Sequence, residues 1–334
     1  MTSQGAYLAK EGEAVLVRIE EENKMRIPLV ALESISCFGR VSMSPFLMGH
    51  CSEKDISVSF HTKNGRFLAR VVGPTSGNVL LRRAQYRLAD ESSEAALIAR
   101  YMLIGKVANS RTVLKRHLRD HADASGRQQV QEAAQKLARI LERLQEPLEL
   151  ETARGLEGDA ARVYFKAFEH LSSVKQEAFR FKKRSRRPPL DPINALLSFC
   201  YTLLFHDVRS ACESVGLDPQ VGFLHRDRPG RPSLALDLVE ELRSVLADRL
   251  TLSLINRLQI TPDEFQTSET GKVTMSDEAR KTLLTGYQER KADQITHPYL
   301  QEKITLGLLP HIQARLLAKY IRGELMAYPP FFWK

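Results

Sequence analysis

The chain has 334 residues, of which 49 are Lys or Arg and 40 are Asp or Glu, so its formal net charge is +9. A surplus of positive charge favours polyanionic partners such as nucleic acid, although it does not determine a fold. The four cysteines stand far apart without a Cys-x-x-Cys spacing, so we expect free, buried thiols. There is no signal-peptide core and no apolar run of the roughly 20 residues that a membrane span needs. We expect a soluble, cytoplasmic protein.

The first 88 residues carry the period-two pattern of β-strands. Asn64-Gly65 suits the positive φ angles of a tight turn, which predicts a hairpin there. We expect residues 1–88 to form a small antiparallel β domain. The predicted strands are 14–19, 25–35, 56–60 and 66–72.

Beyond residue 90 the apolar residues recur with the period of 3.6 that is typical of amphipathic helices. The sequence therefore predicts an α+β protein, in which the β domain precedes a larger all-α catalytic domain, residues 89–334. The predicted helical segments begin near residues 92, 128, 155, 192, 233, 276 and 298.

An Arg-rich loop ending in a helix carries the most informative pattern. His225 opens this loop, and Asp237 and Glu240 follow 12 and 15 residues later, about 60° apart on the helix that Ser233 begins. Imidazole with carboxylates is a ligand set of Mn²⁺ or Mg²⁺ rather than of a thiolate zinc site. Taken singly, the two acids are better explained as a solvated helix face near a favourable helix dipole. Their joint placement favours a metal site.

Two further segments have the same dual interpretation. Glu157 stands between Gly155 and Gly158 at a predicted helix start, where small neighbours would let the carboxylate and another backbone approach closely, as a ligand position needs, or where the acid simply complements the helix dipole. A basic run then leads into Asp191-Pro192, a good helix cap and first turn. The run is either a solvated loop or a DNA-contacting segment, and its residues are Arg180, Lys182, Lys183, Arg184, Arg186 and Arg187.

The helix after the basic run is apolar nearly all round, yet Asn194, Ser198 and Tyr201 form a polar stripe along it. Buried polar groups need partners. Either an ordinary hydrogen-bond network or an active site would supply them. We predict that Asn194 and Tyr201 line the active site as catalytic residues.

In this order, the segments Gly155–Gly158, Arg187–Ala195, Gly222–His225 and Ser233–Leu238 resemble the CRISPR adaptation integrase family, endonucleases that insert new spacers into the repeat array. The resemblance extends to 271–274, Arg280-Lys281 and Tyr287. It implies a metal, Mg²⁺ or Mn²⁺, held by Glu157, His225 and Glu240, with Asp237 as a nearby acid. The family often has Asp where this chain has Glu240, and Glu241 follows directly, so the third ligand is either glutamate.

The resemblance also implies partners. The family forms homodimers through its β domains, and two such dimers sandwich a dimer of a small ferredoxin-like adaptation protein in a hetero-hexamer. That complex holds a short DNA duplex and joins its 3′-hydroxyls to the repeat.

The chemistry of joining agrees with the residues. A 3′-hydroxyl attacking a phosphodiester needs a Lewis acid, and cationic side chains must neutralise the remaining charge. We predict Arg226, Arg228 and Arg231 for that task, together with DNA binding. His225 is either a metal ligand or the acid/base. The alternatives are a stand-alone structure-specific nuclease of DNA repair, with water as nucleophile, and a non-enzymatic DNA-binding scaffold.

Overall fold

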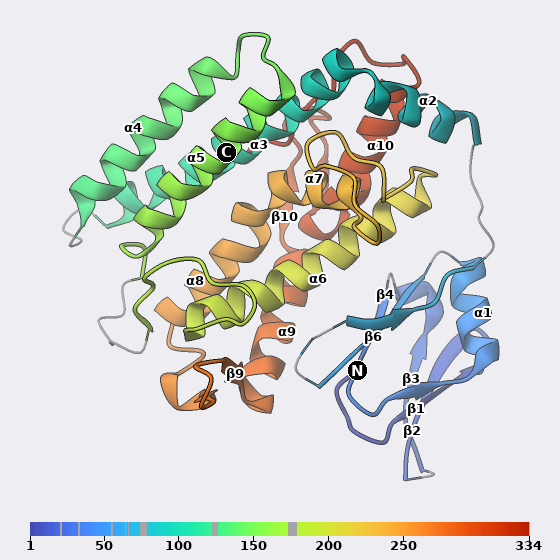
Figure 1. Ribbon diagram of the computed structural model, residues 1–334. Helices are drawn as coiled ribbons and strands as arrows, with labels where there is room; N and C mark the ends of the chain where they lie inside the picture. Colours follow the sequence, from blue (N-terminus) through green and yellow to red (C-terminus); the bar gives the residue numbers. More distant parts are fainter. Residues whose placement is uncertain are drawn as a thin grey trace. The chain divides into compact units, whose positions relative to one another are not determined.

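The computed structural model describes residues 1–333 apart from residues 21, 33, 55, 64, 66, 74–78, 122–125 and 173–178. The chain divides into two compact units, residues 1–76 and 77–334. A strand-rich unit is followed by a mainly helical one, which confirms the predicted α+β class (Figure 1). No helix in the part of the chain that the structure describes is long and apolar enough to cross a membrane.

The first unit is built from two small sheets around one apolar core. One sheet has the strand order β3-β2-β1-β5 and the other the order β4-β6-β7. Alternate side chains of the strands, such as Leu8, Val15 and Val58, point into this core. The elements are β1 (Tyr7–Glu11), β2 (Ala14–Ile19), β3 (Glu22–Pro28), the 3₁₀ turn η1 (Leu29–Ala31), β4 (Ser34–Phe38), β5 (Ser42–Met43), α1 (Pro45–Glu53), β6 (Ser57–His61) and β7 (Phe67–Arg70).

The strand predictions for this unit are correct in kind but not in every detail. The pairs β1–β5 and β4–β6 are parallel, so the unit is mixed rather than wholly antiparallel. The single strand predicted over 25–35 is wrong, because β3 ends at Pro28 and a 3₁₀ turn separates it from β4. The pair β6–β7 is antiparallel as predicted; Asn64 lies outside the described residues, and Gly65 has φ +80°.

The second unit is a stack of helices with two short hairpins. Helix α3 packs against α4, α5 and α7, and α6 packs against α7 and α10 (Figure 1). The elements are α2 (Val79–Asp90), α3 (Ser92–Asp120), α4 (Arg127–Arg143), α5 (Leu150–Phe168), α6 (Pro192–Ser214), α7 (Ser233–Leu242), the π-helical turn η3 (Arg243–Asp248), α8 (Arg249–Asn256), η4 (Pro262–Glu264), β8 (Phe265–Thr267), β9 (Val273–Met275), α9 (Asp277–Ala292), β10 (Gln294–Thr296), β11 (Lys303–Thr305), η5 (Leu306–Leu308) and α10 (Leu309–Ile321).

The boundary between the units lies near residue 76 rather than at the predicted residue 88. Residues 79–90 form helix α2, which belongs to the helical unit. Its Gln85 is fully buried, and its amide group donates to the carbonyl oxygens of Asp218 and Val221 at 2.8 and 2.7 Å. These bonds tie α2 to the segment that leads into α7.

The predicted helix starts at residues 192 and 276 are correct, and each has a side-chain cap in the structure. Asp191 caps α6 by accepting from the Asn194 N–H at 2.7 Å, and Ser276 caps α9 by accepting from the Ala279 N–H at 3.1 Å. The helix predicted near Pro298 is wrong: that segment is the turn of the β10–β11 hairpin, held by the Leu300 N–H donating to the His297 ring, and α10 begins at Leu309. The four cysteines are free and buried, as predicted.

Candidate functional site

Two carboxylates meet in the middle of the helical unit. Glu157 lies in the second turn of α5, which begins at residue 150 and not near Gly155 as predicted, and Glu240 lies on α7. The Lys106 ammonium, on α3, forms ion pairs with Glu157 Oε1 and, at 2.8 Å, with Glu240 Oε2. One amino group therefore bridges the two predicted metal ligands.

Glu240 is buried, with a side-chain exposure of 2%, so it is not part of a solvated helix face. Its Oε1 is paired with Arg243 Nη1 at 2.8 Å. Burial alone would raise its pKa, but Arg243 and Lys106 overcome this effect and hold the pKa of Glu240 at about 2. Glu240 is thus a buried anion at every physiological pH.

The neighbouring Glu241 is a different kind of group. It is completely buried, and burial raises its pKa to about 8, against the opposing hydrogen bonds. Its carboxyl group is bonded to Tyr328 Oη, Gln313 Nε2 and the Phe331 N–H at 2.7, 3.0 and 2.9 Å. A carboxyl group that is neutral near pH 7 and fully engaged by the C-terminal segment is a poor metal ligand. Glu240 is the better candidate of the two.

His225 is oriented by Asp237. Its Nδ1 lies 2.6 Å from Asp237 Oδ1. The same carboxylate group also accepts hydrogen bonds from the backbone N–H groups of Phe223, Leu224 and His225 at 2.7 to 3.0 Å. The carboxylate reaches these groups because residue 222 is glycine, where a Cβ would stand 2.7 Å from Asp237 Oδ2. Asp237 is fully buried and acts as a positioning residue, leaving Nε2 of His225 for a ligand or a proton.

The glycines beside Glu157 have no such role. A Cβ at Gly155 or Gly158 would meet nothing within 4 Å, so the predicted close approach at these positions is wrong.

A cavity of about 30 Å³ adjoins the carboxylate pair. Two buried polar atoms at this cavity, Arg243 Nε and Ser244 Oγ, have no hydrogen-bond partner among the described residues, and Glu240 Oε2 lies 2.8 Å from the Lys106 ammonium. The residues that line the cavity are Lys106, Val107, Ser110, Glu157, Ala160, Ala161, Tyr164, Phe165, Arg186, Tyr201, Glu240, Arg243, Ser244 and Asp248.

The donor set fits a hard divalent cation, because it combines the carboxylate oxygens of Glu157 and Glu240 with the imidazole nitrogen of His225. As the side chains stand, however, no three His, Cys, Asp or Glu residues within the described ranges are gathered closely enough to hold a metal ion. Lys106 occupies the space between Glu157 and Glu240.

Asp248 also lines the cavity. It accepts hydrogen bonds from Tyr201 Oη at 2.6 Å and from Tyr164 Oη at 2.9 Å. Tyr201 in turn lies between the guanidinium groups of Arg184 and Arg243, at 5.2 and 5.0 Å from the ring centre. The predicted site residue Tyr201 thus borders the cavity, and its hydroxyl group is already committed to Asp248.

Asn194 does not line the carboxylate cavity. It is fully buried, and its side-chain oxygen accepts from the Ser185 N–H and Arg184 Nη1, while its amide nitrogen donates to Lys183 O at 2.8 Å. Its role is to shape the segment before α6. An ordinary hydrogen-bond network thus satisfies its side chain, and the catalytic role stays a prediction.

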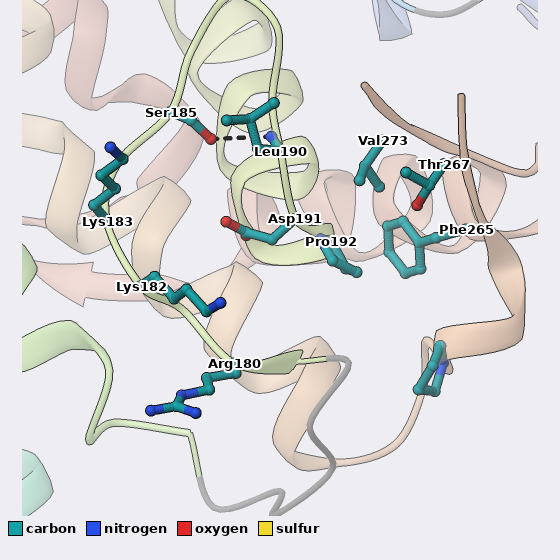
Figure 2. A pocket seen from close by; sticks show the side chains of 11 residues that line it. Arg180, Lys182, Lys183, Ser185, Leu190, Asp191, Pro192, Phe265, Thr267 and Val273 are labelled. Atoms are coloured by element: carbon teal, nitrogen blue, oxygen red, sulfur yellow. Dashed lines mark hydrogen bonds between the residues drawn. The ribbon is translucent and has the colours of Figure 1, made fainter. Parts of the chain in front are cut away.

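The basic run divides into parts with different surroundings. Arg184 is a structural residue, bonded to Asn194 and Ser198. Arg186 lines the carboxylate cavity. Arg180, Lys182 and Lys183 line a separate pocket of about 500 Å³, whose other wall includes Phe265, Thr267 and Val273 of the β8–β9 hairpin (Figure 2).

The loop arginines do not line the carboxylate cavity. Arg226 is exposed and paired with Glu151 at 2.8 Å, Arg228 is exposed and Arg231 is half-buried. The cations that do line it are Lys106, Arg186 and Arg243, of which Lys106 and Arg243 are not among the predicted site residues. Lys106 stands alone as a cation between Gly105 and Val107 in an apolar stretch of α3, a signal that could have identified it.

Two carboxylates at a small polar cavity with basic side chains are a residue set typical of nucleases and related phosphoryl-transfer enzymes. The family model for the CRISPR-associated protein Cas1 matches residues 1–289. A relative named CRISPR-associated endonuclease Cas1 1, from Chlorobaculum tepidum, is 55% identical over 334 residues, which cover 100% of this chain and 97% of the relative. The chain belongs to the Cas1 family.

Solved structures agree with this assignment. A Cas1 protein from Thermotoga maritima has a TM-score of 0.81 at 25% identity, covering 98% of this chain and 97% of the other. A chain of a Cas6–RT–Cas1–Cas2 complex has a TM-score of 0.82 at 25% identity, covering 100% of this chain and 36% of that longer one.

Asp248 generates a prediction about stability. Burial raises its pKa to about 6, from 3.8, and the two tyrosines and arginines only partly oppose this. The folded protein therefore binds the Asp248 proton more tightly than the unfolded chain does, and this contribution to stability is lost as the pH rises from about 4 to 6. The Asp248→Asn side chain does not titrate, so the unfolding free energy of this variant lacks the fall with pH that Asp248 causes in the wild type. Between pH 4.5 and pH 7.5 the difference in unfolding free energy between the variant and the wild type should therefore change by about 2 kcal/mol in favour of the variant.

Urea unfolding across that pH range measures the difference. Asp159→Asn, an exposed acid on α5, is the control and should follow the wild type at every pH. Parallel wild-type and Asp248→Asn profiles would show that Asp248 does not titrate in this way.

Proposed function

We propose that this chain is a metal-dependent DNA endonuclease and integrase of CRISPR adaptation, which joins the 3′-hydroxyl ends of short duplexes to the repeat array. The observation that carries the proposal is the convergence of Glu157 and Glu240, from α5 and α7, on one small polar cavity. His225, held by Asp237, would complete the ligand set through Nε2. Family membership and the name of the Chlorobaculum relative support the same activity.

The bound cation, Mg²⁺ or Mn²⁺, would polarise the phosphoryl oxygen and favour ionisation of the attacking hydroxyl group. Arg243 and Arg186 stand at the cavity to neutralise the charge that develops on the phosphate. Asp237 keeps the imidazole of His225 in one tautomer and orientation. Nothing in these roles depends on the loop arginines, which would contact DNA outside the cavity.

The partners follow from the same relationship. A chain of the Cas6–RT–Cas1–Cas2 complex shares this fold, so we expect the small ferredoxin-like adaptation protein to bind here as well, in a hetero-hexamer. A stand-alone repair nuclease would use the same site with water as the nucleophile. Covalent joining of a labelled duplex to a plasmid that contains the repeat would support the integrase, and cleavage without joining in the presence of the partner would favour the repair enzyme.

Removal of a ligand tests the catalytic site. Glu157→Ala should lower metal-dependent cleavage and joining by at least about 100-fold, because loss of even an outer-shell partner costs 10–100-fold. The half-exposed Glu157 should be dispensable for folding, and the exposed Asp159→Ala on the same helix should retain activity. Assays in Mg²⁺ and in Mn²⁺ measure both, and an active Glu157→Ala protein would refute the assignment.

His225→Ala should behave like Glu157→Ala. Glu240→Ala should also lose about 3–5 kcal/mol of stability, because it removes the paired carboxylate of the buried Arg243 and one of the two carboxylate partners of Lys106.

The basic pocket in Figure 2 is the proposed DNA-contacting end of the basic run. Each lost phosphate contact lowers the slope of log affinity against log salt by about 0.9 on a duplex. Replacing Arg180, Lys182 and Lys183 with Ala should therefore lower that slope by up to about 2.7 and weaken binding to every sequence alike.

The control for this triple variant removes the same charge elsewhere. Lys136, Arg139 and Arg143 are exposed on α4, and their replacement with Ala should leave the slope close to that of the wild type. If the two triple variants have equal slopes of log affinity against log salt, the basic pocket does not contact DNA.

We infer that the strand-rich unit forms the homodimer interface. It carries exposed apolar side chains, with Val30 at 97% and Phe46 at 84% exposure, which an interface would cover. The double variant Val30→Asp/Phe46→Asp should be monomeric in light scattering at concentrations where the wild type is a dimer. Met326→Asp, an exposed apolar residue of the helical unit, should remain dimeric. A dimeric double variant would exclude this surface.

A further inference from the structure

Lys106 has unusual surroundings for a lysine. Its side chain is only 11% exposed, and its ammonium group forms ion pairs with Glu157 and Glu240. Buried lysines require paired charges, and here both partners are the carboxylates proposed to hold a metal ion. Lys106 therefore stands where a divalent cation would bind.

The same carboxylates cannot serve both cations fully. Glu240 already has a permanent counter-ion in Arg243, which pairs with its other oxygen at 2.8 Å. A divalent cation added beside both Lys106 and Arg243 would leave more positive than negative charge around two carboxylates, in a buried place where charges are poorly screened.

The Lys106 side chain can move from this position toward solvent. Glu157 is 32% exposed, so its side of the pair reaches solvent, and the four-carbon stem of lysine can turn its ammonium toward that opening. Arg243 is less free to move, because its guanidinium also stacks on Tyr201 at 5.0 Å.

We propose that Lys106 is the counter-ion of the metal-free site, which holds Glu157 and Glu240 together until a divalent cation displaces it. The inference rests on the proposed metal site, and it adds that metal binding competes with a cation of the protein itself. Lys106 thereby sets the metal affinity and keeps the two carboxylates in place when no metal is bound.

Manganese titration tests the competition. The bound fraction is read from the loss of the six-line electron paramagnetic resonance signal of free Mn²⁺. In Lys106→Met, which keeps the length of the stem without its charge, the Kd for Mn²⁺ should fall about tenfold or more, since one neighbouring charge shifts an ionic equilibrium by ~10- to 1000-fold. The metal-free variant should melt at a lower temperature than the wild type, and Mn²⁺ should raise its Tm by more.

The matched control is Lys115→Met, the same substitution at an exposed position of α3, which should bind Mn²⁺ like the wild type. Lys106→Gln replaces Lys106→Met if the latter fails to fold. Equal or weaker Mn²⁺ binding in the Lys106 variant would overturn the competition. If Glu157→Gln binds Mn²⁺ as tightly as the wild type does, this result would instead overturn the metal site itself.

A second measurement needs no variant at all. A small amine-acylating reagent at fixed pH, followed by mass spectrometry, reports the accessibility of Lys106 in the wild-type protein, with Lys115 as the internal reference. Displacement predicts faster acylation of Lys106 when Mn²⁺ is present. An unchanged or slower rate would show that the ammonium stays between the carboxylates and would overturn the proposal.

Discussion

A carboxylate buried in the middle of four helical elements is the constraint on which this site depends. Glu240 can remain ionised there only because Arg243 and Lys106 each bring a positive charge to one of its oxygens. Lys106 comes from α3 and also contacts Glu157 on α5, so one electrostatic requirement joins α3, α5 and α7. Because the penalty for an unpaired buried charge is large, the packing of these helices and the geometry of the site are inseparable.

A second, independent device positions the imidazole. Asp237 binds three consecutive backbone N–H groups and the His225 ring, and it approaches them through the space that Gly222 leaves. The loop end is thereby fixed to α7 by hydrogen bonds, while the carboxylate pair is fixed by charge. Glu241 provides a third attachment, to the C-terminal segment around Tyr328 and Phe331. Helix α7 thus carries three adjacent acids with three distinct tasks: orientation, ionic pairing and anchoring.

The sequence predicted what depends on local pattern. The strand-to-helix change and the capped starts of α6 and α9 are visible in short spacings. It failed where distant parts of the chain decide. The burial of Glu240, the structural commitment of Asn194 and the pairing of Lys106 with Glu157, 51 positions away, follow from helix packing that no window of residues contains.

Some errors had a local cause. A pair of glycines beside an acid suggested close approach, yet both glycines face open space. A run of six cations suggested one surface, but Arg184 is turned inward by Asn194, and Arg186 reaches a different cavity from Lys182 and Lys183. Charge density along a chain shows how many cations are present, and only the folded path of the segment shows what each of them faces.

The π-helical turn η3 constrains how this protein can change during evolution. Glu240 precedes the turn and Asp248 ends it, and both line the same cavity because the turn is wound more loosely than an α-helix. If the same number of residues were wound as an α-helix, Asp248 and everything beyond it would be rotated by about 100° relative to Glu240. A segment one residue shorter and without the π-turn would keep the two acids on the same face, so the length and the winding of this segment can change only together.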